Sequence, residues 1–208
     1  MKKILVLFMS IILISSLTAC NITIRPLSNK DPAPVVEAEQ APEPAPVKID
    51  YIKPGTYECG VDLDAGEYVL IETTKNSGFY EHTYDNTGDA SSIISNGWCI
   101  SRMIITIKPG EYFTFESGEM YPIDYAPPVD LSSGKLKAGM YLVGKDFEAG
   151  EYKLIPDKNA SQGGLAIISS DSRNDYSSNI VNEFFETEIY LTVKDGQYLK
   201  MHRCVLIL

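Results

Sequence analysis

Hydrophobic and polar residues alternate along short stretches of this chain, and one such arrangement occurs twice. Residues 52–71 read IKPGTYECGVDLDAGEYVLI and residues 136–155 read LKAGMYLVGKDFEAGEYKLI, so an offset of 84 residues superimposes them. The matched positions include glycines at expected turns and tyrosines within the alternating stretches. Short alternating runs bounded by such turns are typical of β-strands. The internal duplication therefore predicts two related β-modules.

The duplication resumes at the end of each copy. Residues 103–115, MIITIKPGEYFTF, superimpose on residues 189–201, IYLTVKDGQYLKM, at an offset of 86. Each segment predicts a strand, a tight Pro-Gly or Asp-Gly turn, and another strand. The two additional residues of the second copy fall in a polar loop, where a shared framework tolerates insertion.

The middle of each copy is expected to add one strand, at residues 78–86 and 164–172. The following stretches are polar and rich in turn formers, and residues 178–185 are expected to hold one helical turn. Each copy would then have about six short strands, as in a small antiparallel sandwich or barrel. We predict an all-β fold of two tandem antiparallel β-sandwich or barrel-like modules, residues 51–124 and 134–208, with a linker at 125–133.

The composition agrees with an all-β chain, and the net charge argues against one class of binding partner. Of the 208 residues, 44% are hydrophobic and 22% are charged, with 15 Gly, 12 Pro and 13 Tyr. These values are globular, and the three plentiful types suit turns and strands better than long helices. The formal net charge is −10. Because an acidic surface repels the phosphate backbone, nucleic acid is not an expected partner.

The N-terminal segment reads as a targeting sequence. Two lysines precede an apolar run, residues 4–17, that is short for a membrane span and leads into the tetrapeptide LTAC ending at Cys20. LTAC resembles the lipobox of bacterial lipoproteins. The resemblance implies that residues 1–19 are a signal peptide and that Cys20 becomes the mature N-terminus, carrying a diacylglycerol thioether and an acylated (palmitate-type) amine. An ordinary secretory leader with an incidental cysteine is the alternative.

Residues 20–50 are expected to form a tether that follows the lipid. They contain six of the 12 prolines, interleaved with Ala, Val, Glu and Gln, and such acidic Pro-rich sequence is extended or disordered. At ~3.1 Å per residue it would reach roughly 90 Å. A PxxP-type ligand motif is the alternative to a plain spacer. Since two acyl chains anchor stably, we expect the protein at the cell membrane, facing outside the cytoplasm.

The repeated pattern also carries a resemblance. G-x-Y-x-V-G-x-D-φ-x-A-G-x-Y, closed about fifty residues later by φ-x-φ-K-x-G-x-Y-φ, resembles a repeated β-module of uncharacterised surface lipoproteins of low-GC Gram-positive bacteria. It covers nearly all of residues 52–208. Its motifs place glycines at turns and tyrosines on strands, so the resemblance implies a framework with no activity attached. The first copy departs from it at Cys59, where the second has Val143.

Candidate chemistry is sparse. The two histidines, His82 and His202, occupy unmatched positions, and the sequence has no nucleophile elbow, HExxH motif or phosphate-binding glycine loop. We therefore expect no catalytic activity. Tyr80, His82 and Tyr84 alternate, which places all three on one strand face. Such a stripe could stack on a sugar or a peptide, and an ordinary strand face is the alternative.

Acidic residues recur at the first turns of both copies and suggest a calcium site. Calcium takes six to eight oxygen ligands from carboxylates and carbonyls. The simpler account is that the first acid of each set accepts hydrogen bonds from turn amides. The candidate ligands are Asp62, Asp64 and Glu67 in the first copy and Asp146, Glu148 and Glu151 in the second.

Three cysteines remain after Cys20. Cys59 aligns with Val143 and Cys99 with Phe185, so both are expected as buried core thiols. A disulfide between Cys59 and Cys99 is a further hypothesis, which requires their Cα atoms to lie within about 7 Å and is permitted outside the cytoplasm. By the same alignment Trp98 corresponds to Phe184 and is expected in the core.

These observations predict a lipid-anchored cell-surface protein that binds or presents a ligand without catalysis. The ligand would be a cell-wall glycan, an envelope protein or a host component, and the membrane is contacted through the N-terminal lipid. The alternative is a structural or accessory component of an envelope or transporter complex, whose modules self-associate or dock. An enzyme acting on wall glycan is a third hypothesis.

Overall fold

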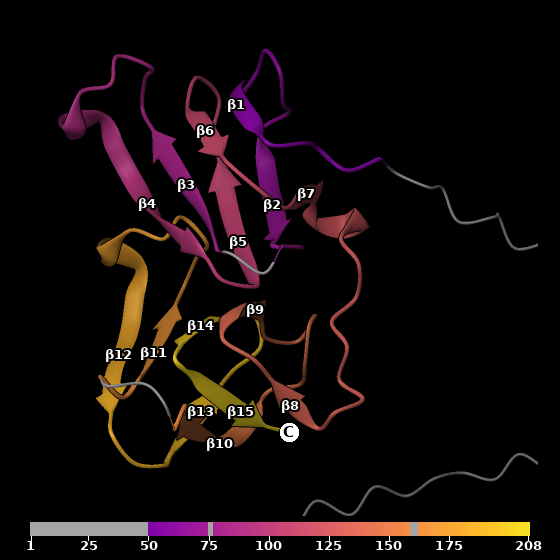
Figure 1. Cartoon of the computed structure of the whole chain (residues 1–208), viewed down its shortest axis with the longest axis vertical. Coiled ribbons are helices and arrows are strands. Elements are labelled where there is room, and N and C mark those ends of the chain that lie inside the picture. The colour runs from indigo at the N-terminus through magenta and orange to yellow at the C-terminus, as the bar shows by residue number, and fades with distance from the viewer. Residues whose placement is uncertain (1–49, 75–76, 159–161) are drawn as a thin grey trace, which may run out of the picture. The chain divides into compact units, whose positions relative to one another are not determined.

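The computed structural model describes residues 50–208, apart from residues 75, 76 and 159–161. The predicted signal peptide, Cys20 and nearly all of the tether lie outside the described residues. The described part consists of strands and three short 3-10 helices, without an α-helix (Figure 1). Within it, no helix has the length and apolar character needed to cross a membrane. The prediction of an all-β fold is confirmed.

The first module contains two antiparallel sheets. One has the strand order β1-β6-β3-β4 and the other β5-β2-β7. Side chains from both sheets form one hydrophobic core, in which Val69, Ile105 and Phe113 are fully buried. The strands are β1 (Gly55–Glu58), β2 (Gly66–Ile71), β3 (Gly78–Thr83), β4 (Ile93–Cys99), β5 (Arg102–Ile107), β6 (Tyr112–Phe115) and β7 (Glu119–Pro122).

The second module repeats this arrangement. Its sheets have the orders β12-β11-β14-β9 and β13-β10-β15-β8, and its own core includes Leu154, Leu199 and Leu206. The strands are β8 (Lys135–Leu136), β9 (Gly139–Leu142), β10 (Gly150–Pro156), β11 (Gly164–Ser169), β12 (Asn179–Phe185), β13 (Ile189–Val193), β14 (Tyr198–His202) and β15 (Cys204–Ile207).

The two modules correspond strand by strand. β1 to β7 match β9 to β15, and the short β8 corresponds to an isolated bridge between Ile52 and Met120. Even an irregularity is shared, because the register shifts between His82 and Thr83 in β3 and between Ile168 and Ser169 in β11. Among the described residues, the first module has seven strands and the second eight, against about six expected for each. The additional strands include β7 and β15, which the chain forms after the last hairpin of each module.

The helical turn expected within residues 178–185 is wrong. That segment is the strand β12, and the helical turn η3 (Tyr176–Ser178) lies just before it. Its counterpart in the first module is η1 (Ala90–Ser92), and a third turn, η2 (Ile123–Tyr125), leads into the linker. The side chains of Asp89 and Asp175 accept hydrogen bonds from the first turn amides of η1 and η3. These caps fix both turns in the same way.

A tyrosine latch recurs four times and explains the G-x-Y motif. In each case the tyrosine hydroxyl donates to the backbone carbonyl four residues earlier, which closes the turn before a strand. At Gly55 and Gly150 the glycine leaves room for the ring, since a Cβ there would lie 3.3 or 3.4 Å from the ring two residues later, whereas at Gly66 it would meet nothing within 4 Å. The pairs are Tyr57 with Lys53 (2.7 Å), Tyr68 with Asp64 (2.6 Å), Tyr141 with Lys137 (3.0 Å) and Tyr152 with Glu148 (2.9 Å).

Candidate functional site

At the junction between the two modules, side chains of the second module pack against the core of the first. In the second module, Tyr141 and Leu199 face the module's own core. Met140, 1% exposed, belongs instead to the core of the first module, with Leu142 and Tyr198 packed against it. β9 and β14 are therefore covered on both faces, and β9 lies beside β5 of the first module.

A loop of the second module, residues 170–175, covers the free edge of β5. The Thr106 amide donates to the carbonyl of Ser172 (3.3 Å), and the two hydroxyls are 2.7 Å apart. The side-chain amide of Asn174 donates to the carbonyl of Ile104 (2.9 Å). The Ser172 hydroxyl also donates to the Glu67 carboxylate. Because β5 is the end strand of its sheet, the loop satisfies backbone groups that would otherwise be unpaired.

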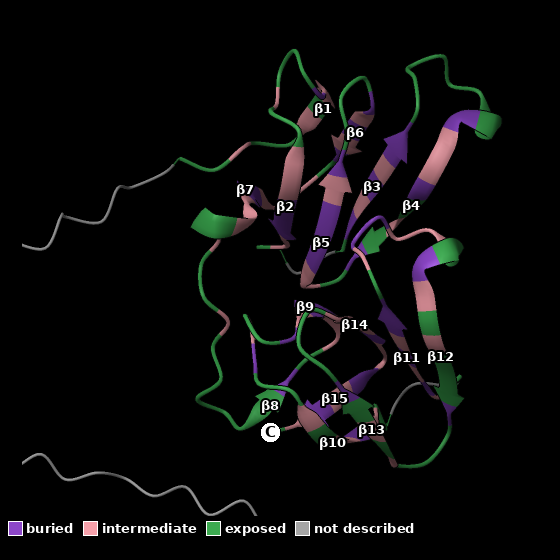
Figure 2. Cartoon of the chain, turned by 180° about the vertical axis from the view of Figure 1, so that it is seen from behind, coloured by how far each residue is buried: buried purple, intermediate pink, exposed green. Residues whose placement is uncertain are grey.

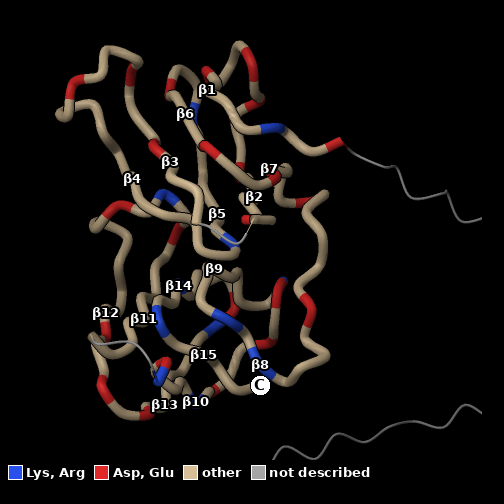
Figure 3. The backbone as a smooth tube through the Cα atoms, in the orientation of Figure 1, with Lys and Arg blue, Asp and Glu red and all other residues tan. Residues whose placement is uncertain are grey.

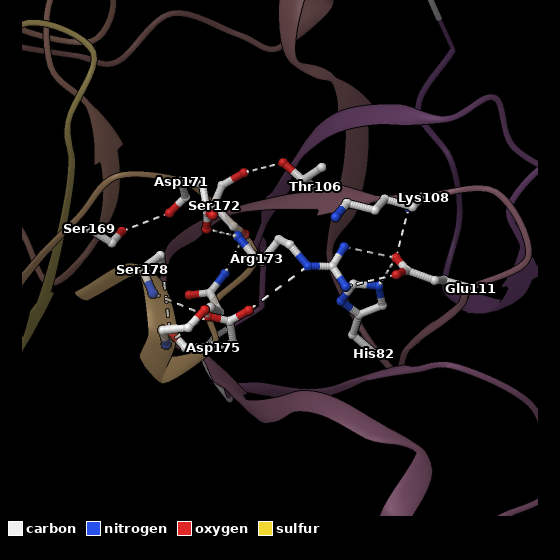
Figure 4. A network of polar contacts seen from close by, with 12 residues as sticks. His82, Thr106, Lys108, Glu111, Ser169, Asp171, Ser172, Arg173, Asp175 and Ser178 are labelled. Carbon is white, nitrogen blue, oxygen red and sulfur yellow. Dashed lines mark hydrogen bonds and ion pairs between the residues drawn. The ribbon is translucent and has the colours of Figure 1, made fainter.

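Next to this loop, His82, Glu111 and Arg173 form a buried polar group, which we call the junction cluster (Figure 4). Arg173 reaches from the second module and donates through Nη2 and Nη1 to the two carboxylate oxygens of Glu111, at 2.7 and 3.1 Å. Nε2 of His82 lies 2.9 Å from Oε2 of Glu111, and the Lys108 amide donates to the same oxygen at 2.8 Å. Such two-pronged charged hydrogen bonds are strong and directional.

Burial determines the electrostatics of the junction cluster. His82 is 0%, Glu111 6% and Arg173 9% exposed. Burial alone would raise the pKa of Glu111, but hydrogen bonds from Arg173, the Lys108 amide and His82 outweigh it and hold that pKa below its ordinary value. Burial lowers the pKa of His82 despite the adjacent carboxylate, so the ring is neutral. Since a carboxylate can only accept, Nε2 carries the proton.

The junction cluster holds the two modules together through hydrogen bonds. The histidine ring is closed off from solvent, and the carboxylate of Glu111 is held by donors on both oxygens. Nδ1 of His82 has no hydrogen-bond partner among the described residues. A substrate would have to separate the modules to reach these atoms. The arrangement therefore supports mutual positioning of the modules, which sequence analysis did not anticipate.

The stripe predicted at Tyr80, His82 and Tyr84 does not form a common exposed face. Tyr80 is 2% and His82 0% exposed, whereas Tyr84 is 60% exposed. The first two point into the core, where their rings lie 6.0 and 6.1 Å from the ring of Phe113. The register shift after His82 interrupts the alternation on which the prediction relied, and Tyr84 follows the end of β3.

The acids of the calcium hypothesis are not gathered into one site. Oδ2 of Asp62 accepts from the Glu58 amide (2.9 Å) and Oδ2 of Asp146 from the Leu142 amide (2.8 Å), so the turn-amide account is confirmed. Asp146 is also paired with Arg102. Asp64 and Glu148 supply carbonyls to tyrosine latches, Glu67 accepts from Ser172, and Glu151 is exposed. In residues 50–208 outside the two gaps, no three His, Cys, Asp or Glu side chains are placed to share a metal ion.

The expected core thiols are confirmed, but the hypothetical disulfide does not form. Cys59 and Cys99 are each 2% exposed, and both are free, as is Cys204. The thiols donate to different carbonyls, of Ile107 and Leu70, at 3.7 Å. Cys59 follows β1 and Cys99 ends β4, the two outer strands of one sheet. Three spacings of about 4.8 Å put these strands ~14 Å apart, beyond disulfide reach.

The core assignment of Trp98 and Phe184 is wrong. They are 60% and 55% exposed, because Cys99 and Phe185 face inward and alternation turns the preceding residue outward. The outward side chains of the two outer strands share the pattern I-x-N-x-aromatic. We call them the β4 ledge (Ile94, Asn96 and Trp98) and the β12 ledge (Ile180, Asn182 and Phe184).

A groove with a volume of about 310 Å³ lies between the β4 ledge and the start of β12. β4 and β12 follow one another along the same side of the two-module unit (Figures 1 and 2), and the groove lies where they meet. Tyr176, 89% exposed, stands at its rim. The side chain of Lys200 donates to Asn174 inside it at 2.9 Å. The other lining residues are Tyr80, Ile93, Ile94, Ser95, Asn96, Ile167, Ser169, Asp175 and Asn179.

Comparison with protein-family models and with curated proteins finds no match to this chain. The candidate site is therefore defined by the geometry alone: the two equivalent ledges and the groove between the β4 ledge and the start of β12.

Proposed function

We propose that this chain is a lipid-anchored binding protein of the bacterial cell surface, without catalytic activity, and that the two ledges and their groove hold the ligand. One observation carries the proposal. The pattern I-x-N-x-aromatic is present in both copies on the outward faces of β4 and β12, where Ile94 is half-buried and the other five side chains are exposed, so core packing does not account for it. Large exposed apolar residues grouped on one side of a protein are typical of interaction surfaces.

The chemistry of the ledges favours an extended polymer that combines apolar faces with hydrogen-bonding groups. Trp98 and Phe184 offer flat apolar rings, and Phe79 supports the first at a centroid distance of 5.5 Å in an edge-on arrangement. Asn96 and Asn182 add amides that both donate and accept. A glycan strand of the cell wall has this chemistry, with apolar ring faces and hydroxyls. Two ledges in line would contact two separated units of one strand.

The sequence upstream supports the same location. A lipidated Cys20 and a tether that could span roughly 90 Å would carry the ledges away from the bilayer and into the wall. Acyl chains account for membrane attachment, so the folded part needs no apolar membrane face. The net charge of −10 is compatible with a neutral or cationic polymer.

Co-sedimentation with purified wall glycan would test the proposal. Residues 21–208 should bind the insoluble glycan, and Trp98→Ala or Phe184→Ala should each weaken binding about tenfold, as expected for aromatic residues at the centre of a contact. The double variant should abolish detectable binding. Tyr125→Ala, which removes a 59% exposed tyrosine away from the ledges, is the matched control and should bind like the wild type.

Two results would count against it. If the protein does not bind glycan but captures an envelope protein through Trp98 and Phe184, the ledges are a protein-binding surface and the ligand class is wrong. If the ledge variants bind every envelope fraction as the wild type does, the ledges are not a binding surface.

A further inference from the structure

The contact between the modules is head to tail, because each module contributes a different face. The second module uses β9, β14 and the loop 170–175, which we call the head face. The first module uses β5 together with Glu67 and Glu111, which we call the tail face. Since the modules are copies, the first module also has a head face (β1, β6 and the loop 84–89) and the second a tail face (β13, Glu151 and Gln197).

No described residue of the chain covers either of these two counterpart faces. On the unused tail face Tyr190 is 63% exposed, whereas its counterpart Ile104 is 0% exposed. On the unused head face Asn86 is exposed, whereas its counterpart Ser172 is 0% exposed. β13 is the end strand of its sheet, as β5 is. An uncovered edge strand is a ready template for pairing with another chain.

We propose that the unused head face of one chain docks on the unused tail face of a second copy. Chains would then associate through the same kind of contact that joins the two modules. A contact between two different faces is heterologous, so it continues from chain to chain as a filament or closes as a ring.

The backbone of the unused head loop, residues 84–89, has the same turn as the loop 170–175 that contacts β5. Gly88 has φ 76° and its counterpart Asn174 has φ 61°, so both loops turn through the left-handed region at the same step. Oδ1 of Asp85 accepts from the Thr87 amide at 3.0 Å, as Oδ1 of Asp171 does from the Arg173 amide. The carbonyl of Asn86 is therefore presented as that of Ser172 is. It can accept from the amide of an edge strand.

The tail face of the second module has the same hydrogen-bonding residues that contact the head loop in the first module. Thr106, which contacts Ser172 through its amide and hydroxyl, corresponds to Thr192. Glu67, which accepts from Ser172, corresponds to Glu151. Thr192 and Glu151 are exposed. The side-chain amide of Asn86 can donate to Glu151 as the Ser172 hydroxyl donates to Glu67.

The two charged residues that join the modules have neutral counterparts on the unused faces. Arg173 corresponds to Thr87 on the unused head, and Glu111 corresponds to Gln197 on the unused tail. A buried glutamate opposite a threonine would be an unpaired charge, which costs several kcal/mol. Because both partners changed to neutral side chains, docking would bury no unpaired charge. Gln197 keeps the local role, since its Oε1 accepts from the Lys194 amide (2.8 Å) as Glu111 accepts from Lys108.

The apolar part of the contact is smaller between chains than within one. Met140 corresponds to Thr56 and Leu142 to Glu58, so less apolar surface leaves water. The whole chain also carries 28 acidic against 18 basic residues. In the described part, acidic residues lie along both modules (Figure 3). Repulsion between chains is screened by salt. Association should therefore be weaker than the junction and should strengthen with ionic strength.

Analytical ultracentrifugation tests the inference. Residues 21–208, which retain the whole two-module unit, should show a weight-average mass that rises with concentration between about 10 µM and 1 mM, more so at high salt. Glu151→Lys on the tail face or Asn86→Trp on the head face should weaken association at least tenfold, because the introduced lysine cannot accept from Asn86 and a tryptophan is too large for a position whose counterpart, Ser172, is fully buried. Glu183→Lys makes the same charge change as Glu151→Lys at an exposed position of β12 outside both faces and should associate like the wild type.

A mixing experiment identifies the head-to-tail geometry. The Glu151→Lys chain keeps its head face and the Asn86→Trp chain keeps its tail face, so each alone should stay monomeric. Their mixture should form dimers and nothing larger. A wild type that is monomeric throughout, a mixture that stays monomeric, or equal weakening by Glu183→Lys would overturn the inference. Trp98 and Phe184 lie outside both faces, so glycan binding by the Glu151→Lys chain is a separate readout of the proposed function.

Discussion

Arg173 of the second module and Glu111 of the first, 62 residues apart in the chain, share two hydrogen bonds of 2.7 and 3.1 Å across the junction. Both side chains are buried, and His82 lies against the same carboxylate. Neither module could keep its own half of this group buried without the other, because an unpaired buried charge is costly. The two modules should therefore unfold together as one cooperative unit.

Removing Arg173 should destabilise the whole unit. Arg173→Ala leaves Glu111 buried with only His82 and the Lys108 amide as partners, so we expect the free energy of unfolding to fall by about 3–5 kcal/mol. The double variant Glu111→Gln with Arg173→Thr copies the neutral pair Gln197 and Thr87 and should recover most of that loss. Denaturant unfolding followed by tryptophan fluorescence and by circular dichroism measures both changes.

Lys145→Ala is the control for loss of a cation at the junction. Lys145 pairs with Asp124 at 3.0 Å, but these side chains are 42% and 83% exposed. Exposed pairs contribute little, so this change should stay within about 0.5 kcal/mol. A loss in the double variant as large as in Arg173→Ala would show that the cost comes from packing and not from the unpaired charge.

The unit should lose stability on mild acidification. Burial, together with Lys200 and Arg203, lowers the pKa of His202 from 6.5 to about 4, and burial also lowers the pKa of His82. The unfolded chain then binds protons below pH 6.5 that the folded chain binds only at lower pH, so stability falls as the pH drops from 6.5 toward 4. The lowered pKa of Glu111 adds a further loss below about pH 4.5.

Thermal melting at pH 7.0 and pH 5.0 checks this dependence. We expect a lower melting temperature at pH 5.0 for the wild type and a smaller difference for His202→Gln, which removes one of the two histidines. An unchanged melting temperature across this range would contradict the lowered pKa values of the two histidines.

Gly139→Ala should weaken the junction. Gly139 has φ 155°, and a Cβ there would lie 2.8 Å from Oγ of Ser101 and 3.2 Å from the carbonyl of Arg102 in the other module. We expect a loss of at least about 1 kcal/mol, because both backbone and neighbour must shift. Gly66→Ala is the matched control within the same G-x-Y motif, since a Cβ there meets nothing within 4 Å. Urea unfolding of the two variants should separate them clearly.

Thiol titration should find three free cysteines after unfolding and none that reacts quickly in the native state. Cys59, Cys99 and Cys204 are buried, and burial raises the pKa of the Cys99 thiol to about 12, so little thiolate forms at neutral pH. The count should be the same with and without reductant in residues 21–208. A rise from one thiol to three on reduction would show a disulfide that the sheet geometry forbids.

The sequence was informative wherever a property is local. Glycine, tyrosine and turn spacing predicted two all-β modules, and Asp62 and Asp146 were assigned to turn amides because such bonds form within a few residues. The repeated pattern placed tyrosines on strands, and the four hydroxyl-to-carbonyl bonds explain why they recur. The prediction failed at two places. A register shift after His82 ended the alternation, so that Tyr84 is exposed while Tyr80 and His82 face the core. Trp98 was assigned to the core although its neighbour Cys99 occupies the inward position.

What the sequence by itself determined is the framework: two copies of one β-module, with conserved turns and buried thiols. Only the tertiary structure decided how the copies meet. Arg173 and Glu111 could be seen in the sequence as unmatched charges, yet nothing local pairs them. Their contact depends on a loop of one module reaching the edge strand of the other. Interactions between residues far apart in sequence depend on the relative position of folded surfaces, and that position leaves no periodic signal along the chain.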